Sequence, residues 1–239
     1  DFSKYDIVIS SSASYCSHWI KVKKPTKHLC YCHTPARYLW GLPTAKEASK
    51  YGILRPFIFL INHFMRTYDY YKAQEVDLFI ANSVNVQSRI KKFYRREAEV
   101  VYPPILDQRS KIKDQKSKTK EKFFLTVGRL SREKHVDVIV KACEELGERL
   151  IVVGTGKEMK NLCSAASCAT TFLGEISDEE LAELYRNCQA FIFCGEEEDF
   201  GMVVVEAQMY GKPVIALNQG GVKETVVDGV TGILFNNPT

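Results

Sequence analysis

The chain has 239 residues, 45% of them hydrophobic and 26% charged, which is typical of a globular protein with one large domain or two of average size. Its net charge of +4 is too small to indicate nucleic acid as the partner, whereas phosphorylated small molecules or an anionic membrane surface fit equally well. No segment has the roughly 18 to 20 apolar residues of a membrane-spanning helix, and the eight cysteines include no CxxC pair, which favours buried, reduced thiols over a zinc or redox site.

The first half of the chain predicts short parallel strands and helices. Residues 6–10 and 28–32 are apolar runs typical of buried strands, and Pro35 stops regular structure after the second. Residues 53–75 predict a long helix with an aromatic face. The remaining predicted elements are a strand over 77–81, a helix that Ser83 caps and that continues to about Tyr94, and a strand over 99–102.

Residues 107–122, DQRSKIKDQKSKTKEK, predict a charged linker because almost none of their side chains could enter a core. The predicted domains are therefore 1–106 and 123–239. In the second domain, short connections join strands at 123–127, 150–153, 171–173, 190–193, 213–217 and 232–235 with helices at 134–147, 156–168, 177–187, 201–210 and 221–227. This strict alternation predicts a parallel, doubly wound sheet with its ligand site at the carboxyl ends of the strands.

Two glycine-containing loops follow the first two strands of the second domain. The loop Gly128–Lys134 contains Arg129 and Lys134, two cations near a helix start, where backbone amides already favour anions. The turn Gly154-Thr155-Gly156 is a weak signal by itself because short glycine turns are common at helix starts. The first loop therefore predicts an anion site.

The most informative loop is 196–201, EEEDFG, which precedes an apolar helix that carries Glu206. A carboxylate within the apolar stretch Met202–Ala207 needs hydrogen-bond donors, and sugar hydroxyls are suitable ones. The amides of Gly201 and Met202 would face an anion at the helix start. Two structural interpretations stay open: a charged loop without function, and an ion pair between Glu206 and a lysine or arginine.

The second domain resembles the C-terminal donor-binding domain of family-4 glycosyltransferases, which are retaining enzymes of the GT-B fold. The resemblance covers Phe123–Phe235 and includes the family's two glutamates separated by seven residues, here Glu198 and Glu206. The matching motifs, in order, are VGRLSREKHVD, VVGTG, FLGEISDEEL, EDFGMVVVEA, GKPVIA, GGVKETV and DGVTGILF. The first domain resembles the latter half of the family's acceptor domain, and YCHTPARYLW (Tyr31–Trp40) is similar to mannosyltransferases of surface polysaccharide and O-antigen assembly.

The resemblance implies an α/β protein with two Rossmann-like, doubly wound parallel-sheet domains, the first incomplete, in a chain truncated at both ends. It implies that Arg129 and Lys134 hold a diphosphate and that Glu206 binds the ribose. Glu198 would contact the transferred sugar as a catalytic residue, and the loop at Ile176 would cradle the base. The other implied donor-binding residues are Gly128, Gly154, Thr155, Phe200, Gly201 and Met202.

On the acceptor side, His33 is the second candidate catalytic residue, in contact with donor sugar or phosphate; an ordinary capping histidine is the alternative. The implied reaction is retaining transfer of a hexose, with GDP-mannose as the leading donor, to a polysaccharide or lipid-linked oligosaccharide. No metal or other cofactor is expected, because Arg129 and Lys134 would neutralise the charge that a metal ion otherwise balances.

A cytoplasmic location is expected, at the inner face of the membrane and without nucleic acid as a partner. The helix over 85–96, with five basic residues, could contact anionic lipid, and a solvated basic face is the alternative. Two other functions stay open: an inactive nucleotide-sugar-binding fragment, and a non-hydrolysing sugar-nucleotide epimerase. A dinucleotide-dependent oxidoreductase is disfavoured because the sequence contains no GxGxxG motif followed by a ribose-binding acid.

Overall fold

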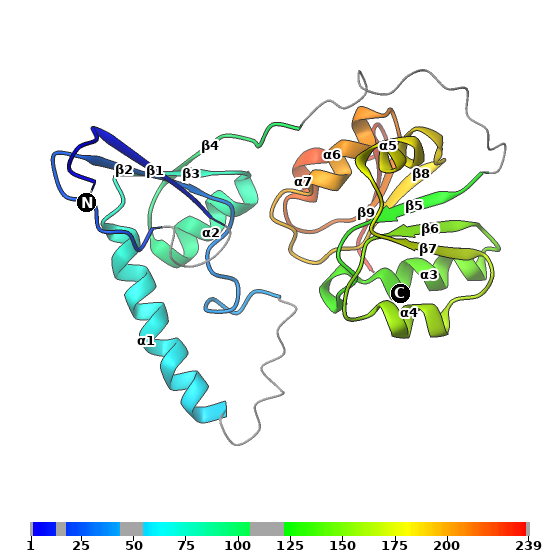
Figure 1. Cartoon of the computed structure of the whole chain (residues 1–239), viewed down its shortest axis with the longest axis horizontal. Coiled ribbons are helices and arrows are strands. Elements are labelled where there is room, and N and C mark those ends of the chain that lie inside the picture. Colours follow the sequence, from blue (N-terminus) through cyan, green and yellow to red (C-terminus); the bar gives the residue numbers. More distant parts are fainter. Residues whose placement is uncertain (1, 13–17, 44–54, 106–121, 238–239) are drawn as a thin grey trace. The chain divides into compact units, whose positions relative to one another are not determined.

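The structure is a computed structural model that describes residues 2–12, 18–43, 55–105 and 122–237. The chain divides into two compact units, Asp1–Pro103 and Pro104–Thr239, and each contains one parallel sheet (Figure 1). The expected α/β architecture with two parallel sheets is confirmed. The predicted linker 107–122 lies outside the described residues except for Lys122, so the domain limits at 106 and 123 stay predictions.

The first unit contains a four-stranded sheet in the order β1-β2-β3-β4. Its strands are β1 (Ile7–Ser12), β2 (Lys27–Cys32), β3 (Leu78–Ala81) and β4 (Ala98–Val100). β4 ends two residues earlier than the sequence predicts, because its partner β3 ends at Ala81, which pairs with Val100. Beyond Ala81 the chain turns into the next helix and offers no further strand to pair with.

Two helices accompany this sheet, α1 (Arg55–Gln74) and α2 (Val84–Tyr94). The predicted cap of α2 is confirmed, since the Ser83 hydroxyl accepts the Val86 amide at 3.0 Å. Val86, Ile90 and Tyr94 lie on one face of α2 and pack into the core of the unit, as their helical spacing requires.

The basic residues of α2 are less exposed than the sequence suggests. Arg89 lies on the core face, is only 5% exposed, and donates a hydrogen bond to the Thr34 hydroxyl at 3.1 Å. Arg96, just after the helix, donates to the carbonyl oxygens of Ala73 and Val76 at 3.0 and 2.7 Å. Two of the five cations expected on a lipid-facing or solvated surface are therefore held within the protein.

A buried carboxylate joins α1 to the rest of the first unit. Asp69 is 0% exposed and accepts hydrogen bonds from the indoles of Trp19 and Trp40, both at 2.8 Å, and from the Tyr94 hydroxyl at 3.0 Å. His18 Nε2 lies 2.9 Å from the same carboxylate. Burial raises the pKa of Asp69, but the hydrogen bonds and the His18 charge outweigh it, so the net shift is downward and Asp69 is ionised.

The second unit contains a six-stranded parallel sheet in the order β10-β9-β8-β5-β6-β7. The strands are β5 (Phe124–Val127), β6 (Leu150–Val153), β7 (Thr170–Gly174), β8 (Ala190–Phe193), β9 (Val214–Leu217) and β10 (Gly232–Phe235). The helices are α3 (Val136–Glu145), α4 (Met159–Ala165), α5 (Asp178–Asn187), α6 (Met202–Met209) and α7 (Val222–Thr225), with a 3₁₀ turn, η3, at Arg132–Lys134. All strands and helices predicted here are present.

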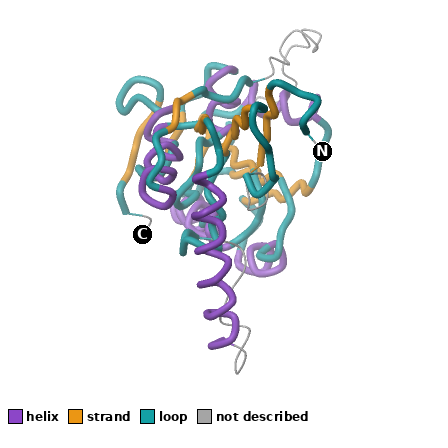
Figure 2. Tube along the Cα trace, turned by 90° about the vertical axis from the view of Figure 1, so that its left-hand side faces the viewer, coloured by secondary structure: helices purple, strands orange, loops and turns teal. Residues whose placement is uncertain are grey.

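Helices cover both faces of this sheet, so the predicted doubly wound arrangement is confirmed. α3 and α4 lie on one face, and α5, α6 and α7 lie on the other (Figure 1). Each face has its own core: Ile139 and Leu162 belong to the first, whereas Tyr185, Val204 and Val222 belong to the second. Strands and helices alternate along this unit, and Figure 2 colours them orange and purple, respectively.

Two helices begin at least two residues later than the sequence predicts. α3 begins at Val136 instead of residue 134, because residues 132–134 form a 3₁₀ turn and His135 adopts a left-handed conformation with φ of +47°. α4 begins at Met159 instead of residue 156. The residues before it support another loop, since a Cβ at Gly156 would lie 2.0 Å from the carbonyl oxygen of Leu130.

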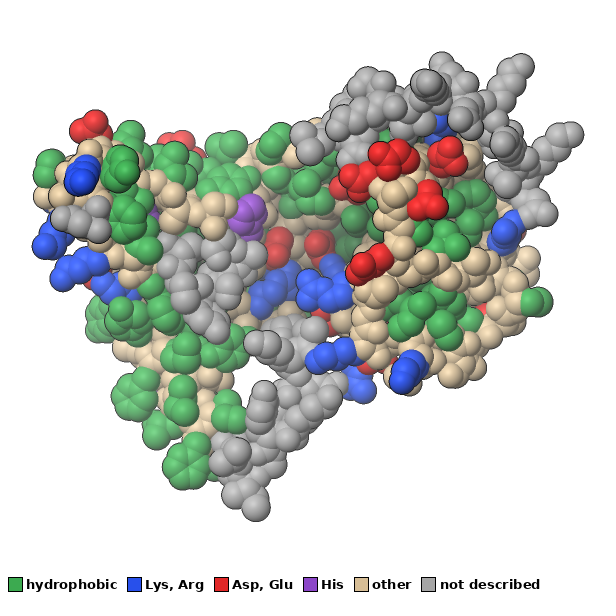
Figure 3. Space-filling model, in the orientation of Figure 1, with side chains coloured by type: hydrophobic (Ala, Val, Ile, Leu, Met, Phe, Trp, Pro, Cys, Tyr) green, Lys and Arg blue, Asp and Glu red, His purple; other side chains and the backbone are tan. Residues whose placement is uncertain are grey.

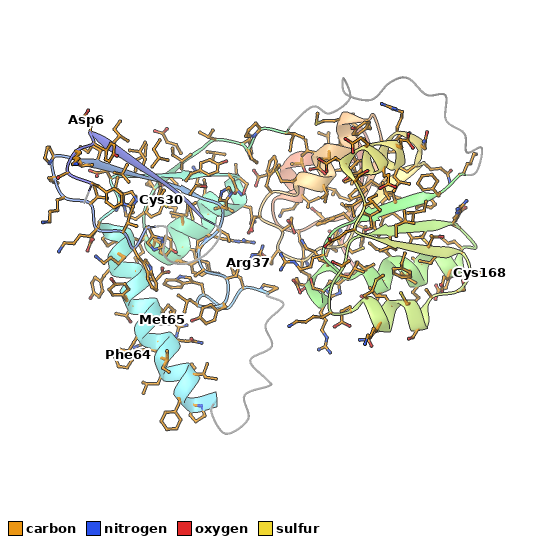
Figure 4. All side chains as sticks on the ribbon, viewed as in Figure 1. Asp6, Cys30, Arg37, Phe64, Met65 and Cys168 are labelled. Atoms are coloured by element: carbon orange, nitrogen blue, oxygen red, sulfur yellow. The ribbon has the colours of Figure 1, made fainter. Side chains whose placement is uncertain are left out.

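The seven cysteines that the structure describes are free thiols. Five are buried, and burial raises the pKa of Cys194 to about 12. The expectation of burial is wrong for Cys163, on the outer side of α4, and for Cys168, labelled in Figure 4, which follows that helix; both are exposed. Of the helices in the described residues, none is long and apolar enough to cross a membrane.

Candidate functional site

The candidate site lies where the loops after β5 and β8 meet. β5 is central in the order β8-β5-β6, and the chain leaves it through α3 toward β6 on one side, whereas β8 leads through α6 to β9 on the other. Connections that diverge from neighbouring strands open a crevice at the carboxyl ends of a parallel sheet. A small cavity here is lined by residues that include Gly128, Arg129, Lys134 and Phe193.

The glycine turn after β6 supports the loop after β5. The amides of Gly128 and Leu130 donate to the carbonyl oxygens of Val153 and Thr155 at 3.0 and 2.9 Å. Gly154 has φ of +121°, and a Cβ there would lie 2.0 Å from the Gly128 carbonyl oxygen. Only glycine fits at this position. The glycine turn, which is a weak signal in the sequence, therefore packs against the loop after β5 that is predicted to bind an anion.

Replacing Gly154 with alanine is expected to lower the free energy of unfolding by about 3 kcal/mol, because strained backbone and steric overlap with Gly128 both oppose the substitution. Gly147→Ala is the matched control: Gly147 also has positive φ, +69°, but nothing lies within 4 Å of the added Cβ. The control should lose only about 1 kcal/mol. Urea unfolding followed by circular dichroism measures both, and equal losses would refute the close-packing interpretation.

Lys134 and Glu198 meet at the crevice although 64 positions separate them. Lys134 ends the turn η3, and its Nζ forms an ion pair with Glu198 from the loop after β8. The same Nζ lies 5.2 Å from the centre of the Phe193 ring, close enough for a cation–π contact. Both charged side chains are about one-fifth exposed, which leaves them accessible to a ligand while reducing solvent screening.

Backbone contacts on two sides position the loop that carries Glu198. On one side the Glu196 amide donates to the Glu133 carbonyl oxygen at 2.9 Å, and His135 Nε2 lies 3.0 Å from the Glu196 carboxylate. On the other side the Gly221 amide donates to the Glu198 carbonyl oxygen at 2.8 Å. The acidic stretch therefore has a defined conformation, to which His135 contributes through its contact with Glu196.

Glu206 lies in the second turn of α6, half-buried, and accepts a hydrogen bond from the Tyr185 hydroxyl at 3.1 Å. Burial raises the pKa of Glu206, and the hydrogen bond from Tyr185 opposes that shift only in part. The partner that the structure records for Glu206 is thus a neutral hydroxyl. Among the described residues, the structure records no ion pair between Glu206 and a lysine or arginine, which is the structural alternative.

The remaining residues predicted to bind a donor surround the same edge of the sheet. Arg129 is exposed, and the Thr155 hydroxyl donates to Glu175 at 3.2 Å, which links the loops after β6 and β7. Ile176 packs against the core beneath α5. At the start of α6, Phe200 and Gly201 are buried and Met202 is exposed, with φ of +91° at Gly201. These are the positions in the structure; their roles stay predictions.

His33 lies in the first unit, directly after β2. Its Nε2 is 3.0 Å from the Ser11 hydroxyl at the end of β1, and its ring contacts the edge of the Tyr31 ring at 5.0 Å. The Tyr31 hydroxyl donates to the Val101 carbonyl oxygen at 2.9 Å. His33 is therefore oriented by side chains from two neighbouring strands.

Several residues that shape the site escape sequence reasoning. Phe193 and Tyr185 belong to the apolar pattern of β8 and α5, so nothing in the sequence distinguishes them from ordinary core residues. Gly220 and Gly221 carry a detectable signal, the pair of adjacent glycines. A Cβ on either would lie 2.4 or 2.3 Å from the carbonyl oxygen of Glu198 or Asp199, respectively.

A second, larger cavity lies between α3 and α4, lined by residues that include Asp137, Lys141, Glu158 and Asn161. It is lined mainly by helix side chains, among them the ion pair of Arg132 and Glu158 at 3.5 Å, and lacks the glycine-supported backbone found at the strand ends. The crevice after β5 and β8 is the better candidate for the functional site, because it lies where the connections diverge and because its glycine-supported loops carry a cation and a carboxylate.

Comparison with known families gives one match, to the family described as "Glycosyl transferases group 1", over residues 107–239. Among curated proteins, the chain is 26% identical to mouse "Alpha-1,3/1,6-mannosyltransferase ALG2" over 97% of its own length and 61% of that protein. It is 41% identical to a "GDP-mannose-dependent alpha-mannosyltransferase" of Mycobacterium tuberculosis over 46% of the chain and 29% of that protein. The chain thus spans less than two thirds of these relatives.

Among solved structures, sucrose-phosphate synthase from Thermosynechococcus elongatus matches 98% of this chain and 61% of its own, with a TM-score of 0.74 and 20% sequence identity. Anabaena Alr3699/HepE in complex with UDP and glucose matches 88% of this chain and 58% of its own, with a TM-score of 0.63 and 22% identity. At such identities the likeness establishes the fold, which is the GT-B type of paired parallel-sheet domains.

Proposed function

This chain belongs to the glycosyl transferases of group 1, and from that membership we propose that its second unit binds a nucleotide sugar for retaining transfer of a hexose. The proposed donor is GDP-mannose, and the proposed family within the group is family 4. The observation that carries the proposal is the meeting of Lys134 and Glu198, a cation and a carboxylate, at the switch point of the sheet.

Each charge suits one part of a nucleotide sugar. A departing nucleoside diphosphate develops negative charge, which fixed cations stabilise, and Lys134 and Arg129 come from the loop that follows β5. The amides at the start of α6 add a positive dipole end. We therefore assign the diphosphate to Arg129, Lys134 and the backbone near Gly201, without a metal ion in this role.

The two glutamates suit the hydroxyl groups on either side of the diphosphate. Glu198 accompanies Lys134 and would accept hydrogen bonds from the transferred sugar, next to the bond that breaks. Glu206, held by Tyr185 in a half-buried position, would accept hydrogen bonds from the ribose. Relatives named as mannosyltransferases, one of them GDP-mannose-dependent, support mannose and guanine as the specific groups.

The acceptor belongs to the first unit in this proposal. His33 would contact the donor sugar or phosphate during transfer, and its hydrogen bond with Ser11 would orient the ring. The proposed acceptor is a polysaccharide or a lipid-linked oligosaccharide.

Calorimetric titration of the chain with GDP, GDP-mannose, UDP and UDP-glucose tests the proposal. We expect the two guanine compounds to bind and the two uracil compounds to bind at least tenfold more weakly. Glu198→Gln should weaken GDP-mannose severalfold, because a contact to the sugar is lost. The same substitution should leave GDP binding unchanged or tighter, because Lys134 no longer has a competing carboxylate.

Glu145→Gln, on the exposed surface of α3, is the matched control and should change neither affinity. The proposal fails if folded protein binds none of the four compounds, or if Glu198→Gln weakens GDP as much as GDP-mannose. Binding of UDP-glucose alone would retain the site and refute the assignment of the donor.

A further inference from the structure

α1 presents a continuous apolar stripe to its surroundings. Six large side chains recur along it at intervals of three and four residues, the spacing that places residues on one face of a helix. Each is between 48% and 66% exposed: Phe57, Leu60, Ile61, Phe64, Tyr68 and Tyr71. In Figure 3 this helix is covered with hydrophobic side chains, and Figure 2 shows it extending beyond the strands and helices of its unit. Figure 4 labels Phe64 on it.

The opposite face of α1 is anchored in the second half of the helix, which fixes the direction in which the stripe points; near the start of α1, Phe59 lies off the stripe and is 70% exposed. Asp69 and Ala73 are 0% exposed, and Asp69 receives the hydrogen bonds of both tryptophans. Because these contacts anchor the helix, it cannot rotate to bury the stripe within the described part of its own unit. A stripe of this length exceeds the scattered apolar residues that are normal on a protein surface.

Positive charge accompanies the stripe. Sixteen of the 33 Lys and Arg residues but only eight of the 29 Asp and Glu residues lie in residues 1–103, so the first unit carries +8 and the rest of the chain −4. Trp19 packs edge-on against Tyr68 at 5.0 Å, which brings the segment that follows it beside α1. That segment carries three exposed lysines, Lys21, Lys23 and Lys24.

We propose that the stripe of α1 docks on the surface of a lipid bilayer that contains anionic lipids. Phenylalanine and leucine side chains would enter the boundary between headgroups and acyl chains, and Tyr68 and Tyr71 would keep their hydroxyls among the headgroups. The three exposed lysines that follow Trp19 in the sequence would interact with lipid phosphates. This inference is independent of the proposed donor and of catalysis.

Charge favours a bilayer over a second copy of the chain as the occupant. Pairing of two stripes would bring together two units of +8 each, and like charges across an interface oppose association. An anionic membrane has the opposite sign. The proposed membrane contact is thus on α1 and not, as the sequence suggests, on α2, because Arg89 and Arg96 of the segment 85–96 form hydrogen bonds within the protein.

Co-sedimentation of the whole chain with vesicles tests the proposal. We compare vesicles of phosphatidylcholine alone with vesicles that also contain phosphatidylglycerol, and we expect tighter binding to the second. Phe57→Ser combined with Phe64→Ser should weaken that binding at least tenfold, and Lys21→Gln, Lys23→Gln and Lys24→Gln together should weaken it severalfold and reduce its sensitivity to salt. All five side chains are exposed, so the fold should tolerate these changes.

Leu146→Ser is the matched control, because Leu146 is 76% exposed in the second unit and should not contribute. The proposal is overturned if the phenylalanine variant binds vesicles as tightly as the original chain, or if the original chain binds neither kind of vesicle. It is also overturned if light scattering shows a dimer that the phenylalanine variant dissociates, since the stripe would then be an interface between copies.

Discussion

Replacing Lys134 with alanine is expected to weaken GDP binding about 100-fold, which corresponds to roughly 2.7 kcal/mol. Lys134 is held against Glu198 and over the ring of Phe193, so its charge is already fixed where the loops after β5 and β8 meet. A charge that is in place before the ligand binds loses little side-chain entropy on binding. Titration calorimetry with GDP measures the change directly.

Lys141→Ala is the control for this experiment. Lys141 is a surface lysine, 75% exposed, whose Nζ lies 3.8 Å from the Glu145 carboxylate within α3. A pair of this kind contributes little, so GDP affinity should stay within twofold of the original value. Equal GDP affinity for Lys134→Ala and Lys141→Ala would remove Lys134 from the diphosphate site.

Replacing Asp69 with alanine is expected to lower the free energy of unfolding of the first unit by about 4 kcal/mol. The substitution leaves Trp19, Trp40 and Tyr94 without their acceptor, and His18 without its counter-charge. Trp19 and Trp40 are the only tryptophans of the chain. Tryptophan fluorescence during urea unfolding therefore reports on the first unit and not on the second.

Two variants separate the network from a general effect of losing a charge. Glu97→Ala removes a carboxylate that is 80% exposed and paired with Lys91, and should cost less than 1 kcal/mol. Asp69→Asn keeps one acceptor oxygen and should cost less than Asp69→Ala. If Asp69→Ala is no worse than Glu97→Ala, the network does not stabilise the unit.

The same network gives a pH dependence with a defined sign. The pKa of Asp69 is lowered in the folded chain, so its stabilising contribution is fully present above the ordinary carboxyl pKa and is lost as pH falls through the lowered folded value. Asp69→Asn should therefore flatten the acid limb of the stability curve.

The architecture of the second unit follows from its sequence because each element is specified locally. Short β-branched strands such as β6 alternate with helices that have clear start signals, such as the capping box of Ser177 and Glu180 at α5. The topological rule for parallel sheets then places the loops after β5 and β8 side by side. Local pattern and general topology are therefore sufficient to expect both loops at the carboxyl edge of the sheet, whereas the ion pair of Lys134 and Glu198 is a tertiary contact that only the structure provides.

Contacts between distant segments are beyond such reasoning. Asp69 lies 50 residues from Trp19 and 25 from Tyr94, and no periodicity links them. The sequence pattern likewise predicts an ordinary helix residue at Tyr185, and only the tertiary structure brings its hydroxyl to Glu206. These are pairwise contacts of the tertiary structure, which a single sequence does not encode in any local pattern.

Competition between local sequence signals explains the smaller differences between the predicted and the observed structure. Charge suggests that Arg89 is solvated, yet its spacing from Val86, Ile90 and Tyr94 places it on the core face of α2, and the spacing prevails. The start of α3 is displaced because Lys134 and His135 are used to form the loop around Glu198 and Glu196. The site thus modifies a helix start that propensity alone would have placed earlier.

Hydrogen–deuterium exchange of the whole chain with and without GDP-mannose tests the central claim most directly, namely that the nucleotide sugar binds at the carboxyl edge of the second sheet. We expect slower exchange on ligand addition in residues 128–134 and 195–206, because a ligand bound to both loops would oppose the opening of their backbone hydrogen bonds. Residues 136–165, which include the cavity between α3 and α4, should be unchanged. Protection confined to α3 and α4, with no change in the two loops, would contradict the account.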